Sequence, residues 1–460
     1  MTVDTIITGG TIVTPGSEME ASVAIDDGII TAVGAESALP RGETRIDASG
    51  LLVLPGVVDP HVHIDEVPAN RAGTYETESA AAALGGVTTL IDFAWQGGDR
   101  SFEDDEASLL DGIKHKKAKG ETSHVDFGLH GVLHRERPET FDELAPAIEA
   151  GVTSFKLFMS TYDVGVSNGF IDEAFRHIAD LDAVGVLHTE DPTVCEQQES
   201  RLRKEGRGDP VDYPDSRPDY TEAMGAAAAL RMAEEAGVKY YSVHTSCRKA
   251  AEVIEAFRTD GSRVRAETCT HYTALDRSVH EEVGNDAMIA PPLRSQADVA
   301  AMFEYLKRGT LSVVSTDHAV YHSSFKDVDQ WWNSPYGANS VQRSLPVFHH
   351  EAVVERGFSY PFLVRVMCSN PARTFGMPQK GTLEPGTDAD IVLFDPNKTQ
   401  TIRAETNASN ASTSIYEGRE VAGAVDRTLV RGTVVADGDD VVSDPGHGSF
   451  VERELPDWST

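Results

Sequence analysis

The feature that most constrains the fold is a regular alternation of short apolar runs with amphipathic or charged stretches in the middle of the chain. Eight runs have the length and the Val, Ile and Leu content of buried strands, and helical patterns separate them. Eight strands separated by helices are typical of a closed (β/α)8 barrel. The expected strands are 51–58, 87–93, 125–133, 154–158, 185–187, 240–243, 264–268 and 312–315, and the expected helices are 77–84, 102–115, 141–150, 172–181, 221–236, 250–258 and 297–307.

A doubly wound open sheet is the alternative, but it requires fewer strands and a glycine-rich phosphate turn, which the sequence lacks. Residues 5–46, 381–395 and 427–435 instead have strand patterns with turn signals. We therefore predict an α/β fold, a TIM-like (β/α)8 barrel with a small β-sandwich domain built from both termini. The expected bounds are 1–52 and 379–460 for the two parts of the sandwich domain and 53–378 for the barrel, with a polar tail from Pro445 on the surface.

The composition excludes several classes of partner. The formal net charge is −34, from 74 acidic against 40 basic residues in a chain of 460, which argues against binding to nucleic acids or to anionic membranes. The acidic surface predicts a salt-adapted (halophilic) host, with an ordinary acidic enzyme as the alternative. We find neither a signal-peptide pattern nor an apolar run of ~18 residues. Four scattered cysteines without a CxxC pattern indicate free thiols in a reducing cytoplasm.

His61-Val62-His63 follows the first apolar run. Two histidines at positions i and i+2 of a strand project from the same face, so both can bind one metal ion, although this motif alone is common. In a barrel, the carboxyl ends of all the strands form one rim, which carries the active site. Further candidates at or beside the ends of other expected strands are Lys156, His188, His244 and Asp317.

Each of these residues also has a structural interpretation. A histidine can be a hydrogen-bonded core residue, and an aspartate can cap the following helix. Lys156 is flanked by Phe155 and Leu157, where a charged amine is costly to desolvate without a salt bridge. In the functional interpretation, the neutral amine has captured carbon dioxide as a carbamate that bridges two metals ~3.5–4 Å apart. Four other histidines near strand ends are expected to be structural or to support the ligands: His130, His134, His271 and His318.

Taken together, these residues resemble the binuclear amidohydrolases that open cyclic amides. The resemblance extends from the Ile6-Ile-Thr-Gly-Gly-Thr segment to Gly446-His-Gly-Ser-Phe-Val-Glu-Arg. His63-Ile-Asp65, Ser154-Phe-Lys-Leu-Phe-Met and the Gly446 segment are similar to dihydropyrimidinases and hydantoinases. Tyr75-Glu-Thr, residues 206–218 and Glu267-Thr-Cys-Thr-His-Tyr look closer to allantoinases. Dihydroorotases commonly carry an arginine where Asp65 stands, so they rank third.

The resemblance implies a site with two divalent metal ions, expected to be zinc. It assigns His61, His63 and Asp317 to one ion and His188 and His244 to the other, bridged by Lys156 carboxylated on Nζ. Asp317 would also act as the general base and then as the general acid. The implied substrate contacts are Tyr162, Ala290 and Tyr336. Each of these departs from the family pattern, which has a tyrosine at the place of Thr161, a serine at the place of Ala290 and Asn-Gly at the place of Tyr336-Gly337.

The implied activity is hydrolysis of a C–N bond in a dihydropyrimidine or hydantoin ring, which gives an N-carbamoyl amino acid. Hydrolysis of allantoin is the alternative. A non-catalytic relative of the family is a third possibility, but it would be marked by a missing ligand, and none is missing here. The expected partners are a small cyclic ureide or imide and further copies of the chain, as a tetramer or dimer, in the cytoplasm.

Overall fold

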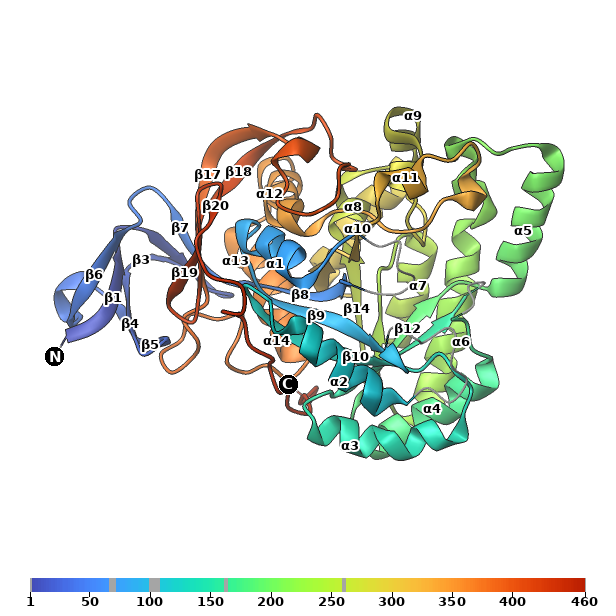
Figure 1. Cartoon of the computed structure of the whole chain (residues 1–460), viewed down its shortest axis with the longest axis horizontal. Helices are drawn as coiled ribbons and strands as arrows, with labels where there is room; N and C mark the ends of the chain where they lie inside the picture. The colour runs from blue at the N-terminus through green and yellow to red at the C-terminus, as the bar shows by residue number, and fades with distance from the viewer. Residues whose placement is uncertain (1, 66–71, 99–107, 161–163, 259–261, 460) are drawn as a thin grey trace.

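The computed structural model describes residues 2–65, 72–98, 108–160, 164–258 and 262–459. It is a mixed α/β fold whose parallel sheet curls as in a TIM-like barrel, with β sheets packed at one side (Figure 1). The strands of the parallel sheet are buried along most of their length, as expected for a sheet covered on both faces. They are β8 (Val57–His63), β9 (Val87–Trp95), β10 (Asp126–Val132), β11 (Ser154–Met159), β12 (Val184–Thr189), β13 (Lys239–Ser242), β14 (Val264–Cys269), β15 (Val313–Ser315) and β16 (His318–Ala319).

Each of these strands pairs in parallel with its neighbour in the sequence, from β8 to β15. The last strand position is divided into β15, which pairs with β14, and β16, which pairs with β8 through His318 opposite Val62. Asp317 lies between the two pieces with a backbone φ of 48°. The parallel pairing brings the carboxyl ends of all the strands to one edge, as predicted for the candidate site.

The expected strand 51–58 is in fact two strands. Residues 52–55 form β7 (Leu52–Pro55), which pairs with β17 (Ile391–Thr401) outside the barrel, and β8 starts after Gly56. A Cβ atom at Gly56 would lie 2.0 Å from Oγ1 of Thr88, so the chain needs glycine at this crossing. His61 and His63 therefore lie within the first barrel strand and not after it.

Helices pack around the barrel at the predicted places: α1 (Tyr75–Leu84), α2 (Leu109–Gly120), α3 (Leu144–Glu149), α4 (Asn168–Asp180), α6 (Asp219–Ala236), α7 (Arg248–Phe257) and α10 (Gln296–Arg308). Part of the expected helix 102–115 falls on residues 99–107, outside the described residues. The prediction missed α5 (Pro192–Glu205), because most of its residues are polar and show no apolar stripe. The shorter helices are α8 (Thr270–Ala274), α9 (His280–Val283), α11 (Ser323–Lys326), α12 (Ser344–His349), α13 (Tyr360–Val364) and α14 (Asn370–Thr374).

Two β sheets pack beside the barrel. The four-stranded sheet has the order β5 (Ile29–Gly34), β4 (Ser22–Asp26), β1 (Thr2–Thr8) and β6 (Arg41–Asp47). The seven-stranded sheet has the order β20 (Asp440–Val441), β19 (Thr433–Asp437), β18 (Glu420–Val430), β17, β7, β2 (Thr11–Val13) and β3 (Glu18–Glu20). Buried Ile, Val and Leu side chains from both sheets form one apolar cluster between them.

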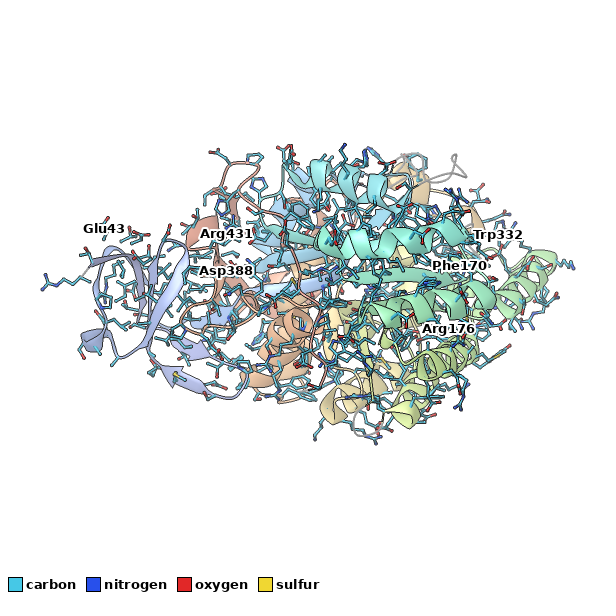
Figure 2. The ribbon with its side chains drawn as sticks, turned by 90° about the horizontal axis from the view of Figure 1, so that it is seen from below. Glu43, Phe170, Arg176, Trp332, Asp388 and Arg431 are labelled. Carbon is cyan, nitrogen blue, oxygen red and sulfur yellow. The ribbon has the colours of Figure 1, made fainter. Side chains whose placement is uncertain are left out.

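A buried ion-pair cluster joins the barrel to the β sheets. Nζ of Lys380 lies 2.5 Å from Asp126, 2.8 Å from Asp388 and 2.9 Å from Asp390. Arg431 forms a further ion pair with Asp126 at the start of β10. Figure 2 shows Asp388 and Arg431 at this junction. The three carboxylates are close enough to suit a metal ion, but the lysine ammonium already binds all of them, so we interpret the cluster as structural.

Most of the polar tail from Pro445 lies on the surface, as predicted, but hydrogen bonds hold it against the barrel. Ser449 and Val451 hydrogen-bond to the backbone of Phe127 at the amino-terminal edge of the barrel. The side chain of Arg453 is 4% exposed and donates to the carbonyl of Leu129 and, at 2.9 Å, to the hydroxyl of Ser154. The sequence did not predict these contacts, because a charged residue such as Arg453 is usually exposed to solvent. In the structure, backbone carbonyls of the barrel strands bind the tail.

In the described part of the chain, no helix is both long enough and apolar enough to cross a membrane. All four cysteines are buried free thiols: Cys195, Cys247, Cys269 and Cys368.

Candidate active site

Three of the predicted metal ligands converge at the mouth of the barrel. Nε2 of His61 lies 3.3 Å, and Nε2 of His63 3.2 Å, from the same carboxylate oxygen of Asp317. The three ligand atoms all lie within 4.8 Å of one another. Burial alone would raise the pKa of the Asp317 carboxyl, but the nearby imidazoles of His61 and His63 hold it well below its ordinary value.

Hydrogen bonds fix the orientation of His61. Its Nδ1 lies 2.6 Å from Oε1 of Glu267 and so donates to that buried carboxylate, which leaves Nε2 as the free acceptor. Glu267 also accepts from the hydroxyl of Tyr241 at 2.7 Å and from the backbone N–H of His244 at 3.1 Å. Glu267 therefore joins the first, sixth and seventh strands of the barrel behind the ligands.

Two more predicted ligands, His188 and His244, form a second group. Nδ1 of His188 lies 2.8 Å from Nε2 of His244. Nε2 of His188 donates to Oε2 of Glu190 at 3.0 Å, so Nδ1 is the atom available for a metal. The His61 and His244 rings are 5.3 Å apart between centroids, which places the two groups side by side. His244 has a backbone φ of 38°.

Glu190 is held as a carboxylate by the charged groups around it. Burial would raise its pKa, but Arg217, at 2.7 Å, and His188 lower it to about 2. Arg217 is 2% exposed and belongs to a buried network in which Arg294 pairs with Glu222 at 3.1 Å and donates to the carbonyl of Arg217. This network supports the strand-five side of the site.

Lys156, the predicted bridging residue, is fully buried on β11, with Nζ 4.8 Å from the ring centroid of Phe158 and 5.3 Å from that of Phe93. The charge of Lys156 also acts on the second histidine group. Burial lowers the pKa of His244 well below its ordinary value, and the charges of His188 and Lys156 lower that pKa further. The structure therefore places the amine beside the same histidines that the sequence analysis grouped with it.

The donor set fits metal ions. Two imidazole nitrogens face one anionic oxygen, and the lone pair of His61 points there because its other nitrogen donates to Glu267. This arrangement requires a cation between the groups, either a proton or a metal. Imidazole nitrogens with carboxylate oxygens are the ligands that zinc prefers in catalytic sites. Nδ1 of His188 and Nε2 of His244, which are both buried, offer a neighbouring position for a second metal ion.

The predicted substrate contacts have mixed outcomes. Tyr162 lies outside the described residues. Ala290 is partly exposed at the start of the Pro-Pro segment. Tyr336 packs in a cluster of aromatic side chains. Its ring centroid lies 5.5 Å from that of Tyr213, and the guanidinium of Arg217 lies 5.4 Å from the same centroid. Its side chain thus contacts the protein, and a role in substrate binding remains a prediction.

Lys326 connects the two segments that contain Ala290 and Tyr336. Its buried Nζ lies within hydrogen-bond distance of four backbone carbonyls, 2.6 Å from that of Gly337, 3.2 Å from those of Asn285 and Asp286, and 3.4 Å from that of Met288. The backbone N–H of Gly337 donates to the Met288 carbonyl at 2.8 Å. These hydrogen bonds hold the segment before Ala290 against the segment that contains Tyr336.

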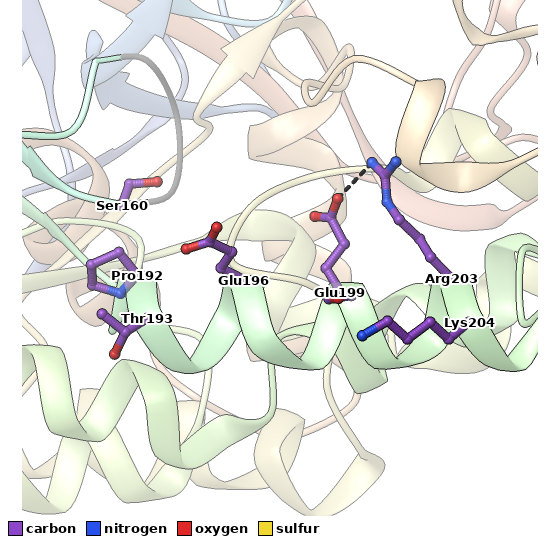
Figure 3. A pocket seen from close by; sticks show the side chains of 8 residues that line it. Ser160, Pro192, Thr193, Glu196, Glu199, Arg203 and Lys204 are labelled. Atoms are coloured by element: carbon purple, nitrogen blue, oxygen red, sulfur yellow. Dashed lines mark ion pairs between the residues drawn. The ribbon is translucent and has the colours of Figure 1, made fainter.

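A cavity of about 690 Å³ opens along α5, from Ser160 at the end of β11 to Lys204 (Figure 3). Half of its lining residues are charged, and Glu199 pairs with Arg203 at 2.6 Å one turn further along the same helix. None of its lining residues belongs to the group of candidate ligands. We place the chemistry at the converging histidines, because they bring ligand atoms together at the barrel mouth, whereas the carboxylates of the other such group already bind Lys380.

Comparison with known proteins agrees with this geometry. Residues 52–435 match the amidohydrolase family model. The chain belongs to the amidohydrolase family. It is 35% identical to a D-hydantoinase of Streptomyces coelicolor over 99% of both chains, and 31% identical to an allantoinase of Salmonella choleraesuis over 98% of this chain and 99% of the relative. The structure of a dihydropyrimidinase from Brevibacillus agri matches with a TM-score of 0.93 at 30% identity, over 98% of this chain and 99% of that one.

The predicted resemblance to hydantoinases, dihydropyrimidinases and allantoinases is thereby confirmed. Within this amidohydrolase, sequence reasoning missed the residues that orient the ligands, above all Glu190, Glu267 and Arg217. Glu190 had a detectable signal, because it stands two residues after a candidate histidine. Glu267 stands in a quoted motif but had no assigned role, and Arg217 had no signal beyond its place in residues 206–218.

Proposed function

We propose that this amidohydrolase hydrolyses a ring C–N bond of a neutral cyclic ureide or imide, of the hydantoin or dihydropyrimidine type, and releases an N-carbamoyl amino acid. The observation that carries the proposal is the convergence of His61, His63 and Asp317 beside His188 and His244. The printed activities of its relatives, D-hydantoinase and dihydropyrimidinase, support the substrate class.

In the proposed site, His61, His63 and Asp317 hold one divalent ion and His188 and His244 hold another, both expected to be zinc. When bound, two such ions supply Lewis acidity and lower the pKa of a water molecule. Asp317 accepts a proton from the attacking water on its carboxylate and transfers it to the leaving ring nitrogen. The carboxyl group is ionised before the reaction, because the imidazoles of His61 and His63 hold its pKa well below its ordinary value.

Lys156 is proposed to carry a carboxyl group on Nζ. The neutral amine attacks carbon dioxide, a C–N bond forms, and one proton leaves, so a cation in an apolar strand becomes an anion with two oxygen ligands. Its full burial and its two aromatic neighbours support this, since an ammonium there is costly and an anion between two metals is compensated.

The charge at the mouth favours a neutral substrate ring. Asp65 follows the His61–His63 pair, and its carboxylate pairs with Lys119 at 3.0 Å. Lys119 also donates to the backbone carbonyl of Asp65 at 3.1 Å. This lysine is therefore occupied, and no arginine stands at this place to bind a ring carboxylate. We accordingly rank an anionic dihydroorotate-like ring below a neutral one.

Allantoin is the second candidate, favoured by the allantoinase relatives. Two of the three sequence features that pointed to it have structural roles. Tyr75 is buried with its ring 5.2 Å from Phe127, and Arg207 pairs with Asp212 and Asp215 at 2.8 and 2.7 Å. His271 is the exception, and we return to it below.

Substrate preference tests the proposal directly. We expect kcat/KM on the metal-replete enzyme to be highest for dihydrouracil or hydantoin. A preference for allantoin by more than ~10-fold, or ~1.4 kcal/mol of transition-state discrimination, would replace the first choice with the second. The absence of hydrolysis of all three rings, together with no bound metal, would instead favour a non-catalytic family member.

We also propose that the β-sandwich domain is assembled from both ends of the chain, with the bounds 1–52 and 379–460 around a barrel at 53–378. The seven-stranded sheet supports this, because β7 lies between β2 and β17 in its order. A cytoplasmic homo-oligomer, dimer or tetramer, is proposed from the family resemblance and from the four buried thiols.

Salt adaptation makes a separate prediction. Because the chain carries a net charge of −34, screening should relieve carboxylate repulsion, and the thermal unfolding midpoint should rise between ~0.1 and ~2 M KCl. The control is the same titration closer to the isoelectric point of about 4.7, where the repulsion and thus the salt response should be smaller. A midpoint that stays flat or falls at neutral pH would argue for an ordinary acidic enzyme.

A further inference from the structure

His271 is a buried histidine at the mouth of the barrel to which the mechanism above gives no role. It lies at the beginning of α8, two residues after the end of β14, on the same edge as the candidate ligands. Its side chain is almost fully buried, with 1% of the residue exposed. Cys269 at the end of β14 pairs with Ser315 of β15, so His271 and the proposed ligand Asp317 each follow this pair by two residues at the same edge of the barrel.

Neither ring nitrogen of His271 has a hydrogen-bond partner among the described residues. In that part of the chain, it is the only histidine of which both buried nitrogens lack one. A buried polar atom without a partner costs free energy, so such groups in native proteins call for an explanation, such as a ligand.

Two other histidines near strand ends show the structural alternative. His130 is satisfied at both nitrogens, at 2.6 Å by the Ser154 hydroxyl and at 2.9 Å by the Pro60 carbonyl. His318 pairs with Glu78 at 2.9 Å and accepts from the backbone N–H of Ser340 at 3.1 Å. His271 differs from both, because neither of its ring nitrogens has a hydrogen-bond partner in the described part of the chain.

We propose that His271 binds the substrate ring by donating a hydrogen bond to the ureide or imide carbonyl that is not attacked. This inference rests on the proposed function and specifies a residue that recognises the ring. Burial lowers the pKa of His271 to about 4, so the imidazole is neutral at pH 7 and has one N–H to donate. A carbonyl flanked by ring nitrogens is a strong neutral acceptor, and a neutral donor matches it without requiring a charge on the substrate.

The test compares His271→Phe, which removes both nitrogens, with His271→Gln, which keeps an N–H donor. The control is His349→Phe: His349 is also a buried histidine with one unpartnered nitrogen among the described residues, but it faces β18, where it bonds to the Ala422 carbonyl at 2.8 Å. For each variant, kcat and KM are measured with dihydrouracil and hydantoin, together with bound metal per chain and the thermal unfolding midpoint.

We expect His271→Phe to raise KM at least ~10-fold, because it removes an interaction made before the chemical step. His271→Gln should stay within ~3-fold of the original KM, and His349→Phe should leave KM unchanged. Bound metal should be unchanged in all three, and the His271→Phe midpoint should not fall, because the substitution removes two unsatisfied polar atoms.

An unchanged KM in His271→Phe would overturn the inference while leaving the proposed function standing. Loss of metal or a lower midpoint in that variant would also overturn it, since the histidine would then be structural. If the unaltered enzyme hydrolyses neither ring, the proposed function fails, and the inference fails with it.

Discussion

Replacing Lys156 with alanine should remove metal and activity together, with kcat/KM falling at least ~10³-fold. The amine is fully buried beside the second histidine group, so its loss removes the proposed bridge between two cations. Short carboxylic acids such as acetate or propionate should restore part of both, because they can supply two oxygens in the vacated space. Bound metal per chain and turnover are measured on the same samples.

Lys239→Ala is the matched control. Lys239 is also a buried lysine of a barrel strand, but it lies at the opposite edge, where it pairs with Asp182 at 2.9 Å. Its removal should lower the unfolding midpoint and leave the metal content unchanged. Intact-mass or crystallographic data showing an unmodified Lys156 in a metal-loaded, active enzyme would refute the carboxylated bridge.

Asp317→Asn should reduce kcat at least ~10²-fold with the fold intact, because the amide can no longer accept and return the proton. Metal binding is measured alongside, since Asp317 is also a proposed ligand. Asp126→Asn is the control: it weakens the ion pairs to Lys380 and Arg431 at the other edge of the barrel and should affect stability only. Turnover close to normal in Asp317→Asn would assign the proton transfer to another group.

The sequence was sufficient to predict the rim because strand order alone brings residues such as Lys156, His188 and His244 to one edge. Their partners could not be predicted in the same way. His61 and Glu267 are separated by 206 positions, and their contact at 2.6 Å depends on how two strands are staggered across the barrel. The pairing of Arg217 with Glu190 likewise depends on side-chain packing that no periodic pattern records.

In the fold, too, some features could be predicted from local sequence patterns and others depend on contacts between distant segments. The apolar run 51–58 predicted buried strand structure correctly, but its division at Gly56 depends on the close approach of Thr88, a residue of the next strand. The burial of Arg453 depends on backbone carbonyls that become available only when the barrel has formed. Local patterns specify the elements, whereas contacts between distant segments determine where one element ends and another begins.

The backbone conformation at two proposed ligands limits which residue types fit at those positions. Asp317 and His244 both have left-handed backbone angles, with φ of 48° and 38°. Aspartate and histidine tolerate this region better than most residues, and glycine tolerates it best. The residue at each position must therefore meet two requirements: it supplies a proposed ligand atom, and it adopts a left-handed backbone conformation. A descendant that no longer needed the metals could gain stability by acquiring glycine at both positions, so the pair offers a way to recognise relatives that have lost catalysis.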